Sequence, residues 1–227
     1  MFVAASTHCF SDVSFQLACA QLADLEYDKV EIWMNEESEH LKPTFVAEDP
    51  ERFAASFREC TRLTPIAFCL NNDPGNETLL GLAKAAKLLN VTQITIPASP
   101  LGTPFNTEVD RLREYVKIVN QDGIHLSIKT KIGDISEDPH TAVELCESVK
   151  GLGITLDPSH FMCGPHRTIS YDQVFPYVYH VHFRDSTPEM MQTKVGLGEV
   201  DYSRVIDMLE QQKYKQAFSV EILPTQE

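Results

Sequence analysis

Short apolar segments rich in β-branched and aromatic residues recur along the chain and are separated by stretches of helix length. Strands of this kind are typical of parallel sheets, whose strands are buried on both faces. The pattern predicts eight strands, at Phe2–Thr7, Lys29–Met34, Pro65–Leu70, Thr92–Pro97, Ile124–Thr130, Gly153–Asp157, Val178–Phe183 and Phe218–Leu223.

The stretches between these strands carry apolar residues at helical spacing, as in the stripe that joins Phe15 to Leu22. The spacing predicts helices at Phe15–Leu25, Pro50–Leu63 (with Asp49 as N-cap), Asn76–Leu89, Val109–Val119, from Ser136 or Asp138 to Val149, and at Tyr202–Gln211. Glycine and proline interrupt the segment after Phe161, which predicts a short helix at most. Only Pro224–Glu227 follow the last strand, so a full eighth helix is expected to be missing.

Eight parallel strand–helix units can form an open doubly wound sheet or a closed barrel. No G-x-G-x-x-G motif follows the first strand, where a dinucleotide-binding open sheet would carry it. The number and spacing of the strands therefore favour an α/β fold of the (β/α)8 TIM barrel type, formed by a single domain over residues 1–227. In such a barrel the chemistry lies at the carboxyl ends of the strands.

The charge of the chain limits the classes of partner that it can bind. The formal net charge is -14, and an acidic protein repels the phosphates of DNA and RNA, so nucleic acid is disfavoured as a partner. The apolar segments are of strand length, which predicts no membrane-spanning segment, and the first residues lack the pattern of a signal peptide. Six cysteines without a C-x-x-C pair fit a reducing, cytoplasmic setting.

Polar residues gather at the ends of the last three predicted strands. Asp157 and His160 end or follow the sixth strand, His180 and His182 lie on the seventh, and Glu221 lies on the eighth. Carboxylates and imidazoles are common ligands of divalent cations. A single strand-end aspartate or histidine is weak evidence, because it often only satisfies a local hydrogen bond. Three consecutive strand ends of one barrel together predict a functional site.

Four segments carry a more specific signal: D-P-S-H-F from Asp157, H-V-H-F-R-D-S from His180, G-L-G-E-V-D-Y from Gly196, and V-E-I around Glu221. In these segments the chain resembles the xylose isomerase-like TIM barrels, a superfamily of sugar isomerases and epimerases that includes endonuclease IV. The motifs cover the C-terminal half, and the strand spacing extends the resemblance over the whole chain. The resemblance implies an enzyme that moves a proton beside a carbonyl group.

The resemblance also implies a site for a divalent metal (Zn, Mn or Mg), held by Glu, Asp, His and Glu from strands five to eight. Asp157, His182 and Glu221 match three of these four ligands, and Glu221 is also a candidate catalytic base. His160 matches a family position that contacts the substrate or an additional metal. Where the family carries Glu on strand five, this chain has Lys129.

An ammonium group in place of a carboxylate changes the local charge by two units, as much as a divalent cation supplies. Lys129 is therefore expected to neutralise Asp157 and Glu221, to weaken or abolish metal binding, and to serve catalysis as an electrostatic stabiliser or acid. A purely structural ion pair is a second interpretation of Lys129. The Schiff-base chemistry of an aldolase is a third, which the neighbouring acids oppose because they keep the amine protonated.

Other residues near the expected mouth are candidates for substrate binding. Arg184 can bind a phosphate or carboxylate of the substrate or be a solvated surface charge. His8 can line the pocket, and Trp33 can stack on a sugar face or pack in the core. The leading prediction is a sugar or sugar-phosphate isomerase or epimerase that lacks the usual strand-five Glu. The alternative is a non-catalytic or repurposed metal-free barrel that binds a small carbohydrate-like molecule.

Accessibility separates these two functions. An enzyme predicts Asp157 and Glu221 open to the substrate, whereas a binding-only protein predicts both carboxylates sealed by Lys129. An endonuclease IV-like repair enzyme is disfavoured, because strands three and four end in C-L-N and I-P-A and offer no further His or Glu ligand. Exposed apolar helix faces and the missing eighth helix leave room for a homodimer.

Overall fold

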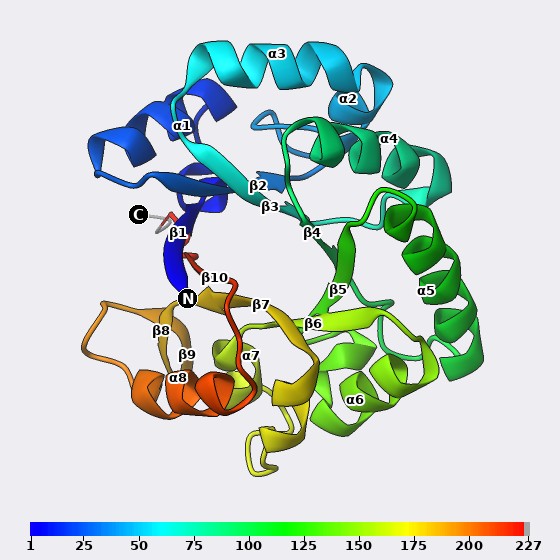
Figure 1. Cartoon of the computed structure of the whole chain (residues 1–227). Helices are drawn as coiled ribbons and strands as arrows, with labels where there is room; N and C mark the ends of the chain where they lie inside the picture. Colours follow the sequence, from blue (N-terminus) through cyan, green and yellow to red (C-terminus); the bar gives the residue numbers. More distant parts are fainter. Residues whose placement is uncertain (225–227) are drawn as a thin grey trace.

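Parallel strands close into a barrel in the computed structural model, which describes residues 1–224 (Figure 1). The strands are β1 (Phe2–Ser6), β2 (Lys29–Met34), β3 (Thr64–Leu70), β4 (Gln93–Pro97), β5 (His125–Lys129), β6 (Leu152–Leu156), β7 (Val178–Phe183) and β10 (Ala217–Val220). They follow one another around the barrel in chain order, and β10 pairs with β1 to close it. The (β/α)8 barrel class is confirmed, and each predicted strand overlaps an observed one. The last strand ends earlier than predicted, at Val220, so Glu221 follows it rather than lying on it.

Helices form the layer around the barrel (Figure 1). They are α1 (Phe15–Asp24), α2 (Pro43–Glu48), α3 (Pro50–Cys60), α4 (Gly75–Leu88), α5 (Phe105–Asn120), α6 (Pro139–Ser148), α7 (Pro158–Cys163) and α8 (Tyr202–Gln211). The loops contain the 3-10 helices η1 (Thr7–Phe10), η2 (Ile135–Glu137) and η3 (Asp172–Tyr177). Asp49 caps α3 as predicted, and the cap of α6 is Asp138 rather than Ser136.

Two short elements go beyond the sequence prediction, the 6-residue helix α2 and a hairpin of β8 (Asp185–Thr187) and β9 (Met190–Thr193) after β7. Helix α7 also spans only 6 residues, as the expectation of a short helix allowed, but it begins before Phe161. A helix of this length has too few turns to show a periodic pattern. The loop after the hairpin is held by Asp185, whose carboxylate accepts hydrogen bonds from the N–H groups of Gly196 and Gly198.

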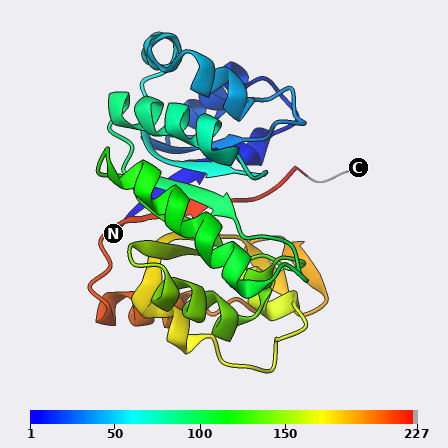
Figure 2. The same ribbon diagram turned by 90° about the vertical axis from the view of Figure 1, so that its right-hand side faces the viewer.

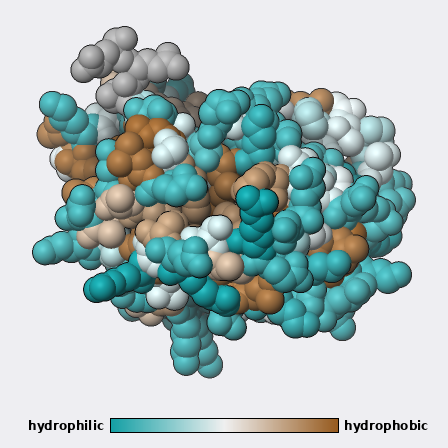
Figure 3. All heavy atoms as spheres, turned by 90° about the horizontal axis from the view of Figure 1, so that it is seen from above, coloured by the Kyte–Doolittle hydropathy of each residue, from teal (hydrophilic) through white to brown (hydrophobic). Residues whose placement is uncertain are grey.

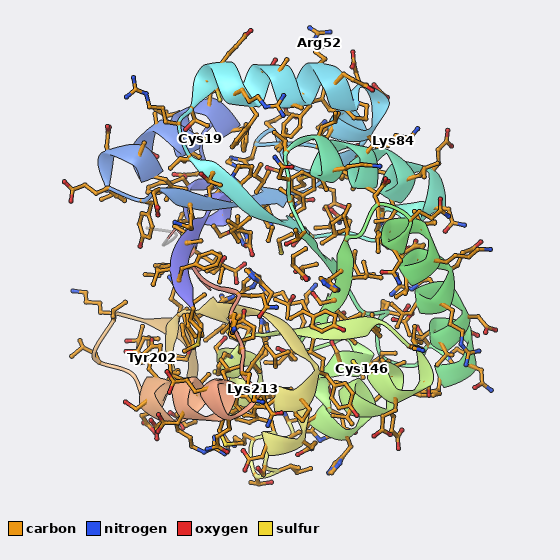
Figure 4. All side chains as sticks on the ribbon, viewed as in Figure 1. Cys19, Arg52, Lys84, Cys146, Tyr202 and Lys213 are labelled. Carbon is orange, nitrogen blue, oxygen red and sulfur yellow. The ribbon has the colours of Figure 1, made fainter. Side chains whose placement is uncertain are left out.

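Strand residues alternate between the helix layer and the barrel interior. On β2, Val30 and Ile32 belong to the hydrophobic core, whereas Glu31 contacts His180 and His182 of β7 across the barrel. Figure 4 shows side chains that fill the layer between helices and strands, where the labelled Cys19 and Cys146 lie. A partly polar interior is thus enclosed by an apolar outer layer, and the polar residues lead up to the carboxyl ends of the strands.

The side view shows the strands running in one direction, with the N-terminus at the end of the barrel from which the strands start (Figure 2). No helix follows β10 among residues 221–224, and residues 225–227 lie outside the described part. None of the helices within residues 1–224 combines the length and apolar character needed to cross a membrane. Viewed from above the orientation of Figure 1, the surface is mostly hydrophilic with scattered hydrophobic patches (Figure 3). The homodimer stays a prediction.

Candidate active site

A cavity of about 230 Å³ opens at the carboxyl ends of the strands. Most of the charged and titratable residues that line it are of the basic types. They are His8 after β1, Lys129 at the end of β5, Lys131, His160 in α7, and Arg184 after β7. None of the residues that line it within 1–224 is acidic. A larger groove of about 640 Å³ between α7 and α8 contains none of the predicted site residues. The basic cavity is therefore the candidate site.

Glu221 lies behind this lining, directly after β10. Its carboxylate is fully buried and accepts hydrogen bonds from Lys129 Nζ (2.7 and 3.0 Å), Arg184 Nη2 (2.6 Å) and His8 Nδ1 (3.0 Å). His182 Nδ1 lies 3.3 Å from Oε2 of the same group. Burial alone would raise the pKa of Glu221, but the positive charges of Lys129 and His182 hold it well below its usual range. The carboxylate therefore stays ionised and is enclosed by donors.

Asp157 directly follows β6 and caps the N-terminus of α7. Its Oδ1 accepts hydrogen bonds from the N–H (3.1 Å) and the hydroxyl (2.5 Å) of Ser159, and its Oδ2 accepts one from Arg184 Nη2 (2.7 Å). Lys129 Nζ lies 4.0 Å from Oδ2. Burial alone would raise the pKa of Asp157, but the charge of Arg184 outweighs burial and lowers the pKa to about 2. This second buried carboxylate is also ionised.

One nitrogen of Arg184 bridges the two carboxylates. Nη2 binds Asp157 Oδ2 and Glu221 Oε2, while Nε is buried without a hydrogen-bond partner among the described residues. Burial alone would lower the pKa of Lys129, but the charge of Glu221 outweighs burial and raises it. Two fixed cations thus balance two buried carboxylates at the mouth of the barrel.

A further buried cluster lies deeper in the barrel. Glu31 Oε2 is bound by His180 Nε2 (2.6 Å) and His182 Nε2 (2.7 Å). Burial alone would lower the pKa of His182, but the charges of Glu31 and Glu221 raise it to about 9. Burial lowers the pKa of His180. His182 is therefore a cation that links Glu31 to Glu221, and the interior is balanced without any added charge.

The predicted metal ligands meet, but their surroundings do not suit a divalent ion. One ligand atom each of Asp157, His182 and Glu221 lies within 4.8 Å of the others, so candidate ligand groups are present. However, Arg184 Nη2 already binds an oxygen of each carboxylate, and Lys129 Nζ lies 2.7 Å from Glu221 Oε2. A divalent ion between these oxygens would contact an ammonium and a guanidinium group. With both side chains in place, the donor set does not fit a metal ion.

Two histidines at the cavity are held in fixed orientations. His8 stacks on Trp33, with 4.0 Å between ring centroids and an interplanar angle of 7°. His160 Nδ1 accepts a hydrogen bond from the backbone N–H of Ile132 (3.2 Å), so Nε2 carries its proton and lies 3.6 Å from Asp157 Oδ2. Burial lowers the pKa of His160 to about 4, and its imidazole is neutral.

All of the predicted site residues therefore lie around one mouth, and their individual roles stay predictions. Sequence reasoning missed Lys131, Asn71 and Met191 as lining residues. Lys131 follows Lys129 by two positions, and Asn71 directly follows β3, so both had a positional signal. Met191 had none, because it enters the lining through the unpredicted β8–β9 hairpin.

A closed parallel barrel with polar residues at its carboxyl end defines the protein as a (β/α)8 barrel with a candidate active site at the mouth. The chain belongs to the xylose isomerase-like TIM barrel family, whose model matches residues 19–227. The sequence resemblance is thereby confirmed. No curated protein matches the sequence.

Solved structures share this fold at low sequence identity. The probable 3-DHS dehydratase AsbF from Bacillus anthracis is 16% identical, with a TM-score of 0.72 over 98% of this chain and 93% of that chain. The 3-keto-D-glucoside 4-epimerase YcjR from E. coli is 15% identical, with a TM-score of 0.75 over 100% and 94%. A xylose isomerase-like TIM barrel protein from Mycobacterium smegmatis in complex with magnesium is 16% identical, with a TM-score of 0.75 over 96% and 89%.

Proposed function

We propose that the protein is an isomerase or epimerase that moves a proton beside the carbonyl group of a small carbohydrate-like molecule, with Lys129 and Arg184 in place of a metal ion. The names of three solved relatives support the reaction class, namely a 3-keto-D-glucoside 4-epimerase, a D-tagatose 3-epimerase-like protein and an L-ribulose 3-epimerase. The observation that carries the proposal is the pair of fixed cations in the wall of the basic cavity.

The two cations suit the charge that this reaction develops. Removing a proton next to a carbonyl group leaves negative charge on the carbonyl oxygen, and donors already aimed at that oxygen stabilise the charge without reorganisation. Lys129 and Arg184 line the cavity, and Glu221 and Asp157 hold them from behind. A substrate carbonyl bound in the cavity would meet positive charge that is already in position.

The buried carboxylates suit a supporting role better than proton transfer. Glu221, the base predicted from the sequence, is fully buried, its oxygens are bound by donors, and its pKa is held low. Each of these features disfavours the acceptance of a proton from a substrate carbon. We therefore assign Glu221 and Asp157 the task of fixing the two cations, and the base must come from the cavity lining.

A binding protein without catalysis is the second candidate function. It is favoured by one specific observation, the complete burial of Asp157 and Glu221 behind Lys129 and Arg184. This is the arrangement that the sequence predicts for a binding protein, whereas open carboxylates were predicted for an enzyme. In that case the same basic cavity would hold a small carbohydrate-like molecule without changing it.

Deuterium exchange separates the two functions. Ketoses and ketose phosphates are incubated with the protein in D2O and a chelator, and NMR follows deuterium uptake at the carbon next to the carbonyl. We expect uptake with wild type and a loss of about 100-fold or more in Lys129→Met, which removes a charge-stabilising donor. Lys87→Met is the control, since Lys87 pairs with Asp122 on the surface. Binding of a compound without any exchange would support the binding protein instead.

A further inference from the structure

We propose that His8 is the base of the reaction, that Glu221 and Trp33 are its positioning residues, and that this single base makes the reaction an isomerisation between neighbouring carbons. The inference rests on the proposed proton-transfer function. It starts from the position of His8 in η1, directly after β1, where its ring lies at the cavity between a buried carboxylate and an indole.

The contacts of His8 define which of its nitrogens is free. Nδ1 lies 3.0 Å from Glu221 Oε1, and an ionised carboxylate only accepts hydrogen bonds, so Nδ1 carries the proton. In the neutral ring Nε2 then keeps its lone pair, and among residues 1–224 the ring forms its side-chain hydrogen bond through Nδ1 and none through Nε2. The parallel stack on Trp33 fixes the plane of the ring. A histidine oriented in this way by a carboxylate is arranged as a general base.

The other titratable side chains of the cavity lining are unsuited to accept a proton. Lys129, Lys131 and Arg184 offer donors only. His160 has its Nδ1 lone pair occupied by a backbone N–H and presents a proton on Nε2. Burial raises the pKa of the Cys69 thiol well above its usual range, so this group is not a thiolate. Within the described part of the chain, His8 is the lining side chain with a free basic nitrogen.

Lys129 stands next to this base. Lys129 Nζ and His8 Nδ1 bind the same oxygen, Glu221 Oε1, at 3.0 Å each, so the ammonium group and the imidazole ring share one wall of the cavity. A substrate bound there places its carbonyl oxygen at the cation and the neighbouring C–H bond at the base. Glu221 therefore couples the two groups that the reaction needs.

One base on one face defines the reaction. The C–H bond breaks, its proton moves to His8 Nε2, and its electron pair forms an enediolate whose charged oxygen faces Lys129. Return of the proton to the neighbouring carbon, with transfer of a hydroxyl proton between the two oxygens, interconverts a ketose and an aldose without any co-reactant. Epimerisation would need a second group that delivers a proton to the opposite face. His160 is not that group, because loss of its Nε2 proton would leave an imidazolate anion. Lys131 is not that group either, because its ammonium group is paired with Asp134 (3.9 Å) and its side chain is 40% exposed.

The test compares wild type, His8→Gln and His125→Gln on a panel of ketoses and ketose phosphates in D2O, with products identified by NMR. His125 is the matched control, because it is exposed at the opposite end of β5. We expect wild type to form the aldose and His8→Gln to lose about 100-fold or more in kcat without a matching rise in KM, while His125→Gln keeps its rate. Imidazole added to His8→Ala should restore part of the activity, which it would not do for a purely structural residue.

The outcomes separate this inference from the proposed function. Unchanged exchange in His8→Gln, or epimeric ketoses as the products, would overturn the role of His8 and leave the proton-transfer function standing. No exchange by wild type with any compound would overturn the function and the inference together. Diethyl pyrocarbonate, which acylates an unprotonated imidazole nitrogen, provides a readout without substrate. It should modify His8, and an unreactive His8 beside a reactive His125 would refute the free Nε2.

Discussion

Removal of the ammonium group at Lys129 tests the charge balance of the site through protein stability. Lys129→Met keeps the aliphatic chain but withdraws the contacts of 2.7 and 3.0 Å from the buried Glu221 carboxylate. At 2.7 Å the attraction of two unit charges is about 6 kcal/mol for an effective dielectric constant of about 20. The cost of burying both ions offsets part of it, and removal of one partner from a buried pair costs about 3–5 kcal/mol. Because Arg184 still contacts Glu221, we expect Lys129→Met to lower the free energy of unfolding by about 3 kcal/mol, the low end of this range.

Urea unfolding measures this loss directly. Trp33 is the single tryptophan and stacks on His8 at the site, so its fluorescence reports on this region, and circular dichroism follows the whole barrel. Lys87→Met is the matched control, because the Lys87 side chain is 65% exposed in its pair with Asp122 and should cost less than about 1 kcal/mol. A Lys129→Met protein as stable as this control would refute the argument that Glu221 depends on the ammonium group.

The same structure gives four further predictions. Elemental analysis should find no stoichiometric metal in wild type and about one Zn2+ or Mn2+ per chain in Lys129→Glu/Arg184→Leu; bound metal in wild type would contradict the charge argument. Inorganic phosphate should raise the melting temperature, and Lys131→Met should reduce this shift, because the basic lining attracts anions. Gly198→Ala should lower the free energy of unfolding in urea by about 1–3 kcal/mol, since its methyl group would overlap a carboxylate of the β8–β9 hairpin. Burial raises the pKa of Asp134 to about 6, so the folded protein holds this proton more tightly than the unfolded chain does. The free energy of unfolding of wild type should therefore fall as pH rises from 4 through 6. Asp134→Asn has no such dependence, and its free energy of unfolding relative to wild type should rise by on the order of 1 kcal/mol between pH 4 and pH 7.

The barrel could be predicted because each strand is a short apolar run bounded by polar residues. The register at the site follows from the same pattern. Lys129 ends β5 and pairs with Thr155 of β6, which places its side chain at the mouth beside Asp157. A slip by one residue would have turned the side chain away from the interior, so the predicted register was the one on which the Lys129 argument depended.

The bridging role of Arg184 was harder to predict, although its position carried a signal. His180 and His182 lie on the inner face of β7, and Arg184 follows the same alternation one position after the strand ends. What the pattern cannot specify is where a long flexible side chain ends. Whether the guanidinium extends to solvent, binds a substrate or turns to Asp157 and Glu221 depends on contacts between distant strands. The sequence made Arg184 a candidate substrate ligand or a solvated surface charge, and its hydrogen bonds to the two carboxylates were not predicted.

The short elements lacked a local signal for another reason. Helix α2 and the β8–β9 hairpin are stabilised by contacts with the rest of the fold, and propensity over so few residues decides little. Asp185 holds the loop after the hairpin through the N–H groups of Gly196 and Gly198, and Gly196 has a positive φ of 88°. The sequence therefore indicated a turn at Gly196 and Gly198, but it did not predict that Asp185 accepts their hydrogen bonds.

Lys129 and Arg184 have to be understood as a pair. Lys129 alone would balance one of the two buried carboxylates, and Arg184 Nη2 supplies the second positive charge by binding both. Lys129→Glu alone would reverse the charge at this position but leave the Arg184 guanidinium between the two carboxylates. The metal-binding variant therefore needs both Lys129→Glu and Arg184→Leu. Fixed organic cations also differ from a metal ion in what they offer a substrate, because they stabilise charge only along their N–H directions. If the protein acts on a carbonyl compound, the positions of these N–H groups relative to His8 decide which carbon loses its proton.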